Sequence, residues 1–144
     1  MAEFPEFIQI DANNKTIKIN SDTVSDFIIE TGTSGIWTYR KWHSGIAECW
    51  GTYINTEVVM NTAWGDFYAG IVNAENINYP LTFKERPREM ASHHFSDTTY
   101  VAVLRPNASI NTTTTTGRYA VTRPTAYETP ITVYLDLYVI GKWK

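Results

Sequence analysis

The strongest folding signal in this sequence is the strict alternation of apolar and mixed side chains along residues 131–140, ITVYLDLYVI. Successive side chains of a β-strand point to opposite faces, so the pattern predicts a strand with one apolar face and one polar, aromatic face. No long window of the chain has the apolar spacing of a helix. The residues predicted to face the core are Ile131, Val133, Leu135, Leu137 and Val139.

A second strong signal is the aromatic segment 32–53, GTSGIWTYRKWHSGIAECWGTY, which contains three tryptophans and four glycines. Alternation predicts a hairpin with one strand at 36–42, a tight turn at 43–45 and a returning strand at 46–53. Such a hairpin is either the centre of a β core or a surface on which ligands stack. Because Trp37 and Trp42 fall on opposite faces of one strand, the tryptophans cannot all stack on one ligand. We therefore interpret the hairpin as a structural hallmark of the fold.

Further apolar segments, separated by Gly, Pro and Asn residues, extend the pattern of an antiparallel β protein. The predicted segments are 27–29 as a buried strand, 57–60, 79–83 as a short element, 100–104 and 119–121, with a loop around 63–68. Residues 111–116, NTTTTT, fit either an exposed loop or a β-branched strand, and we expect part strand and part loop. The predicted fold class is all-β, an antiparallel β-sandwich.

The first 25 residues are predicted to form a unit of their own. Residues 7–10 and 15–20 alternate on either side of the turn-rich stretch 11–14, which predicts a β-hairpin with too little apolar surface to fold alone. Residues 21–25 form a short polar connector. The predicted organisation is an N-terminal hairpin, or neck, with its connector at 1–25 and the sandwich domain at 26–144.

Charge and hydropathy exclude several classes of protein. The net charge is −3 and there is no basic run, whereas nucleic-acid binding requires a concentration of Lys and Arg. No segment approaches the roughly 20 apolar residues of a membrane span. The first 20 residues lack the pattern of a signal peptide. We therefore expect synthesis in a cytoplasm, no membrane insertion and no nucleic-acid partner.

The residues that most often carry catalysis or bind metals form no recognisable set. The single cysteine, Cys49, excludes an internal disulfide, and a small buried side chain is favoured over a reactive thiol. His93 and His94 are neighbours that point to opposite faces of a strand, so the pair cannot chelate one ion. There is no nucleophile elbow, phosphate-binding loop or dinucleotide motif. The sequence also does not give the distance between any two carboxylates, which is what identifies the catalytic pair of a glycosidase. We expect no enzyme activity, no cofactor and no metal.

The segment that best fits a ligand site is 61–70, NTAWGDFYAG. Aromatic rings stack on the apolar faces of sugars, while carboxylates and hydroxyls hydrogen-bond their edges. The alternative is that these rings cap the open end of the sandwich. The candidate ligand-binding residues are Trp64, Asp66, Phe67 and Tyr68.

The aromatic segment 32–53 also resembles the opening of the C-terminal domain of tail-fibre and minor structural proteins from phages and prophages of Gram-positive bacteria. Three later landmarks follow in the order expected from this resemblance: YPLTF at 79–83 with Pro87, the apolar segment 100–104, and the terminal YVIGKW at 138–143. The resemblance covers residues 26–144.

The resemblance implies a β-sandwich similar to H-type lectins that assembles as a homotrimer at the tip of a fibre and contacts a host glycan. The protein would then be part of the virion, made in the bacterial cytoplasm and joined to other phage tail proteins. The expected function is non-catalytic recognition of a bacterial cell-wall carbohydrate. The alternative is a purely structural trimerisation module with no ligand, in which Tyr134, Tyr138 and Ile140 form an intersubunit surface. A third, enzymatic interpretation is a cell-wall hydrolase carried on a fibre.

Overall fold

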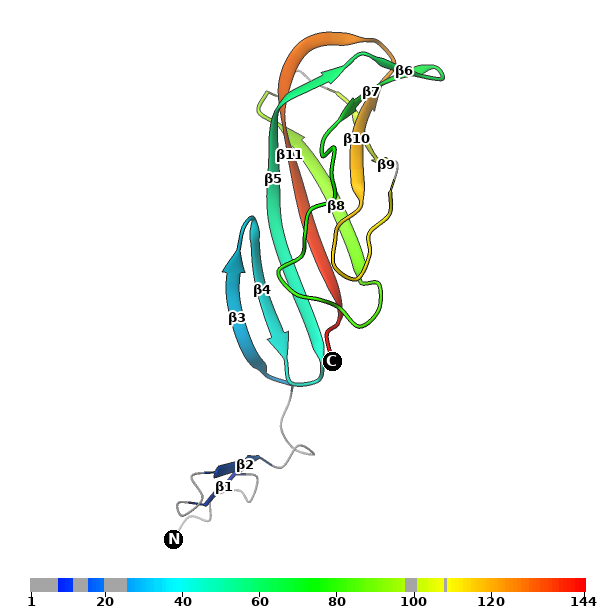
Figure 1. Ribbon diagram of the computed structural model, residues 1–144. Helices are drawn as coiled ribbons and strands as arrows, with labels where there is room; N and C mark the ends of the chain where they lie inside the picture. Colours follow the sequence, from blue (N-terminus) through cyan, green and yellow to red (C-terminus); the bar gives the residue numbers. More distant parts are fainter. Residues whose placement is uncertain (1–7, 12–15, 20–25, 98–100, 108) are drawn as a thin grey trace.

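The computed structural model of the chain describes residues 8–11, 16–19, 26–97, 101–107 and 109–144. Two antiparallel sheets pack against each other as a β-sandwich, and the described residues contain no helix (Figure 1). The predicted fold class is therefore confirmed. The larger sheet has the order β3 (Ile28–Ser34), β4 (Trp37–Trp42), β5 (Ile46–Met60), β11 (Tyr127–Lys142) and β8 (Arg88–Phe95). The smaller sheet has the order β6 (Thr62–Trp64), β7 (Phe67–Ile71), β10 (Arg118–Arg123) and β9 (Val103–Asn107).

The long strands β5 and β11 run side by side through the middle of the larger sheet and carry most of its core residues. The apolar face predicted for β11 is confirmed, because every second side chain from Ile131 to Val139 is at most 3% exposed. The prediction of a separate strand at 57–60 is wrong, because β5 continues unbroken to Met60. Two register irregularities between β11 and β5, on either side of Ile131, let the pair continue past the polar residues in the middle of β5.

The aromatic hairpin forms as predicted and divides its tryptophans between two faces. Gly45 closes the turn with a positive φ of 95° and donates its N–H to the carbonyl of Trp42 at 3.1 Å. Trp37 is buried in the core and its indole N–H donates to the carbonyl of Asn78 at 2.7 Å. Cys49 is also fully buried, and burial raises the pKa of its thiol to about 12. The prediction of a small buried cysteine is confirmed.

Two further strand predictions are wrong, and one strand was missed. The residues at 27–29 are 37–44% exposed instead of buried, because β3 is an edge strand with only β4 beside it. Strand β8 was not predicted, because its outward and inward residues are mostly polar and the sequence shows no apolar face there. The apolar run at 100–104 contributes only its last residues to a strand, which extends to Asn107. Tyr100 lies outside the described residues.

Two long loops, one between β7 and β8 and one between β9 and β10, fill the open side of the sandwich. The predicted element at 79–83 is not a strand, but Tyr79 and Phe83 are buried and their rings meet edge to face at 5.5 Å. Residues 111–116 form a loop with one isolated bridge, between Thr115 and Asn78. The expected strand part of the threonine run is therefore wrong, since among the described residues this single bridge is its only strand-like pairing.

The predicted N-terminal hairpin is also present. Strands β1 (Ile8–Asp11) and β2 (Thr16–Ile19) pair antiparallel, with Ile8 opposite Ile19. The predicted ends of its strands at Phe7, Lys15 and Asn20, and the connector at 21–25, lie outside the described residues. In the described ranges of the chain, no helix is long and apolar enough to cross a membrane.

Candidate ligand-binding surface

The outer face of the smaller sheet carries two of the aromatic residues selected from the sequence. Strands β6 and β7 form a hairpin whose turn is Gly65, with a positive φ of 61°, and Asp66. The register places Trp64 directly opposite Phe67, so their side chains leave the same face of the hairpin. These two rings are 55% and 43% exposed.

This face is the one turned away from the core. Val121 of β10 belongs to the core cluster, and Leu104 of β9, its partner in the ladder, packs against that cluster. The intervening residues Ala69, Ala120 and Thr122 point outward, yet all are at most 6% exposed. Small outward side chains are buried only where larger neighbours cover them. The large outward residues are Trp64, Phe67, Ile71, Val103, Arg105 and Arg118, and the last of these is bonded to Ser109 and Ala74.

Arg105 of β9 is the charged residue of this surface. Its guanidinium carbon lies 3.9 Å from the centre of the Trp64 ring, a close cation–π contact across the width of the sheet. One Nη donates to the carbonyl of Pro106 at 3.1 Å, and Nε is buried with no hydrogen-bond partner. Within the described part of the chain, Arg105 has no ion-pair partner. We call the outward residues Trp64, Phe67, Ile71, Val103 and Arg105 the Trp64–Arg105 surface.

The four candidate residues do not share one face. Trp64 and Phe67 lie together, and Asp66 is exposed at the tip of the hairpin. Tyr68 is half-buried on the opposite face, where its ladder partner is Arg123. Sequence reasoning missed Arg105 because β6 and β9 are opposite edges of the sheet, and no local pattern links two strands so distant in sequence.

The outer face of the larger sheet forms a second exposed surface. Tyr134, Tyr138 and Ile140 are half-buried there, as the alternation of β11 predicts. The guanidinium carbon of Arg40 lies 5.4 Å from the ring centre of Trp42 and 5.3 Å from that of Trp50. The large apolar side chains exposed on this face are Trp50, Ile54 and Met90, at 37%, 53% and 57%.

A buried carboxylate organises the middle of that surface. Glu48 is only 5% exposed and accepts hydrogen bonds from Arg40 Nε and the Tyr138 hydroxyl. Burial by itself raises the pKa of Glu48, but the bonds from Tyr138 and Arg40 outweigh burial and hold it below its usual value. A fully bonded carboxylate of this kind fixes its neighbours in place.

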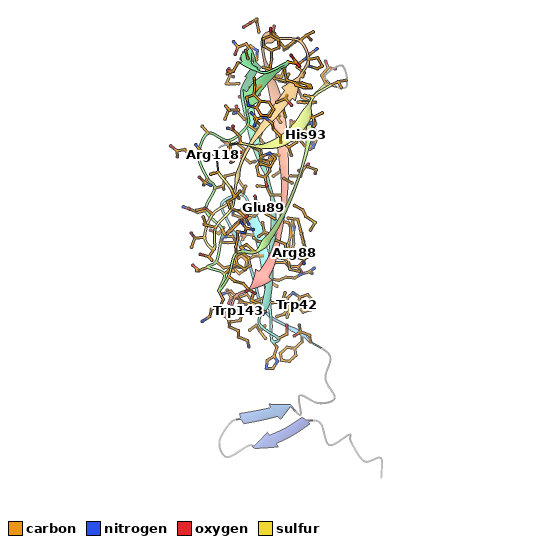
Figure 2. All side chains as sticks on the ribbon, turned by 90° about the vertical axis from the view of Figure 1, so that its right-hand side faces the viewer. Trp42, Arg88, Glu89, His93, Arg118 and Trp143 are labelled. Atoms are coloured by element: carbon orange, nitrogen blue, oxygen red, sulfur yellow. The ribbon has the colours of Figure 1, made fainter. Side chains whose placement is uncertain are left out.

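The adjacent histidines point to opposite faces, as predicted. His94 faces outward, with its Nδ1 2.9 Å from a carboxylate oxygen of Asp136 and its ring stacked on Tyr134. His93 faces inward, with its Nε2 3.1 Å from the carbonyl of Ala102 (Figure 2). In the described ranges, no three His, Cys, Asp or Glu residues are grouped so as to hold a metal ion.

A further carboxylate, Glu89, lies between the two ends of the sandwich (Figure 2). It accepts hydrogen bonds from the hydroxyls of Tyr79 at 2.5 Å and Tyr119 at 2.6 Å, and from the N–H of Gly117 at 3.0 Å. Burial, and then the Glu89 carboxylate, raise the pKa of both phenols well above the ordinary value. Glu89 therefore joins β8 of the larger sheet to β10 of the smaller one and to the loop at Tyr79.

The chain matches no protein-family model, no curated protein and no solved structure. Function is therefore inferred from the chemistry of the two outer faces. Of these, the Trp64–Arg105 surface combines exposed rings with a cation that has no ion-pair partner among the described residues.

Proposed function

We propose that this protein is a non-catalytic receptor-binding domain of a phage tail fibre or tail tip, and that it recognises a bacterial cell-surface carbohydrate. The protein would act as a homotrimer in the virion, joined to other tail proteins. The resemblance of segment 32–53 to tail-fibre domains of Gram-positive phages supports the assignment to a tail. The chemistry of the Trp64–Arg105 surface supports the assignment to carbohydrate.

The observation that carries the carbohydrate assignment is the pair of exposed rings on β6 and β7. Solvent-facing aromatic side chains next to polar groups suit sugars, because one face of a pyranose is apolar and its edge carries hydroxyls. Trp64 and Phe67 remain 55% and 43% exposed although Arg105 lies over one side of the indole. A sugar ring can therefore reach the rings without any rearrangement of the sheet.

The position of these rings in the fold also supports a role in recognition. The hairpin of β6 and β7 lies at the end of the sandwich opposite the C-terminal residues (Figure 1). At that other end, the backbone N–H of Trp143 donates to the carbonyl of Gly45. The backbone N–H of His43 donates to the carbonyl of Phe27, where the chain enters the sandwich. A domain joined to a fibre through its N-terminal side would present the β6–β7 hairpin outward.

Binding to cell-wall material tests the proposal. The purified protein should be retained by wall fractions from Gram-positive bacteria, and Trp64→Ala or Phe67→Ala should weaken retention tenfold or more. Trp50→Ala removes a partly exposed tryptophan from the other sheet and should change retention less than twofold. Absence of binding to every wall fraction, with the protein at about 1 mM, would contradict the proposal.

A second candidate function is a purely structural trimerisation module. Its support is the exposed apolar group Trp50, Ile54 and Met90 around Tyr134 and Tyr138, since contiguous apolar patches of this kind often become interfaces. Ile54→Lys should then convert a trimer to a monomer in light scattering. An intact trimer that binds no wall material would favour this second function, and a stable monomeric wild type would contradict both trimeric assignments.

A further inference from the structure

We infer that the Trp64–Arg105 surface binds anionic carbohydrate, a saccharide bearing a carboxylate or phosphate, in preference to neutral sugars. This inference rests on the proposed function and adds the charge of the ligand to it. It is carried by the placement of one guanidinium group among solvent-facing rings.

The distribution of charge on this face is the first argument. The outward strand residues of the smaller sheet include Arg105 and Arg118 and no acidic residue, although the chain as a whole has a net charge of −3. Arg118 is held by Ser109 Oγ at 3.2 Å and by the carbonyl of Ala74 at 3.0 Å, away from the rings. Arg105 is therefore the positive charge that meets a ligand on Trp64.

The geometry of Arg105 is the second argument. A guanidinium stacked on an indole uses its flat face for the ring and keeps its in-plane N–H groups for acceptors. Among the residues that the structure describes, only one of those groups of Arg105 is bonded, to the Pro106 carbonyl. The planar N–H edge is suited to carboxylate and phosphate oxygens, and charge-assisted bonds of this type are about twice as strong as neutral ones.

The surroundings of Arg105 are the third argument. Its Nε is buried, and the group has no ion-pair partner in the described part of the chain. On the outer face of the larger sheet, by contrast, the guanidinium of Arg40 is balanced by the carboxylate of Glu48. A partly desolvated cation without a counter-charge gains more from an anionic ligand than from a hydroxyl, because the ligand supplies the missing charge.

The test measures binding of the full chain to a Gram-positive wall polysaccharide fraction before and after its charges are removed. One portion has its carboxylates amidated with a neutral amine, and a second has its phosphates removed, so the two portions separate the two sources of charge. We expect at least one treatment to weaken binding tenfold or more. Raising NaCl from 50 to 500 mM should weaken binding to the untreated fraction severalfold, because salt screens an exposed ion pair.

Variants of Arg105 test whether this residue is responsible for the preference for anionic carbohydrate. Arg105→Gln should weaken binding to the untreated fraction tenfold or more and have less than a twofold effect on the neutralised fraction. Arg105→Lys keeps the charge but loses the planar N–H edge. Its affinity for the untreated fraction should lie between those of Arg105→Gln and the wild type. Arg88→Gln removes an exposed arginine from the larger sheet and should bind like the wild type.

Each outcome decides the matter. Unchanged binding after both treatments, or equal losses for Arg105→Gln on charged and neutralised fractions, overturns the inference and leaves carbohydrate binding intact. Absence of binding to the untreated fraction overturns the proposed function itself. If Arg105→Gln does not fold, the treatments and the salt dependence of the wild-type protein give the same decision.

Discussion

The guanidinium of Arg105 lies 3.9 Å from the ring centre of Trp64, although their strands are the two edges of the smaller sheet. The contact is possible because the outward side chains between them are small. Ala69, Ala120 and Thr122 are small and buried, so the two long side chains can extend over them and meet. The same contact that supports the sheet also holds a cation beside an exposed aromatic ring.

Trp64 and Arg105 should therefore stabilise the fold as a coupled pair. A double-mutant cycle with Trp64→Ala and Arg105→Ala should give a coupling energy of about 1 kcal/mol, the range of cation–π contacts that are partly exposed. Chemical denaturation of the four proteins provides the measurement. Additive effects of the two substitutions would show that the contact does not contribute to stability.

Glu89 should be one of the most sensitive polar residues of the sandwich. Glu89→Gln replaces an acceptor of three hydrogen bonds with an amide and should lower the free energy of unfolding by about 2 kcal/mol. Glu85→Gln is the matched control, since Glu85 is exposed and lies 3.5 Å from the equally exposed Lys142. Its effect should stay below about 0.5 kcal/mol. Equal effects of the two substitutions in urea titrations would refute the role given to Glu89.

Gly51 should tolerate no side chain. A Cβ atom at this position would lie 2.1 Å from the backbone carbonyl oxygen of Ile36, so the two strands of the aromatic hairpin would have to move apart. Gly51→Ala should cost about 3 kcal/mol of unfolding free energy, at the upper end for overpacking. Gly35→Asn is the control, because Gly35 has open space around it and asparagine accepts its positive φ of 58°. Thermal melts that rank the two variants in the opposite order would contradict the structure.

Acid should destabilise the protein partly through Glu48. The folded-state pKa of Glu48 lies below the ordinary value of 4.5, so its contribution is complete above that value and is lost as the pH falls through the folded pKa. Glu48→Gln should therefore reduce the acid dependence of the unfolding free energy below about pH 4.5. Some dependence should remain, because a hydrogen bond from Ser44 lowers the pKa of Asp26 and one from Lys41 lowers that of Glu30.

The control for this pH dependence is Glu57→Gln, an exposed carboxylate on the same strand. Its effect on the acid dependence of unfolding should be smaller than that of Glu48→Gln, because Glu57 is exposed and Glu48 is buried. The measurement is urea unfolding at a series of pH values between 2 and 7, with the slope of free energy against pH compared among the three proteins. An unchanged slope in Glu48→Gln would contradict the role assigned to the Arg40–Glu48–Tyr138 bonds.

The candidate site was only half predictable from the sequence. Composition identified the segment around Trp64 and Phe67, because exposed rings beside a glycine turn are a local feature. Period-two alternation separates Phe67 from Tyr68, but it does not say which of the two faces solvent. Arg105 had no local signal, because its contact with Trp64 depends on the order of four strands.

The sequence by itself determined which residues share a face. The alternation of β11, the turn at Gly45 and the division of the tryptophans follow from local backbone geometry, which each strand carries in its own residues. The tertiary structure decided which of those faces are covered. Strand β8, with mostly polar residues, became part of the larger sheet by pairing with β11, and the apolar residues at 27–29 stayed exposed at its edge. The reason is that burial depends on neighbours distant in sequence, whereas side-chain direction depends only on the local chain.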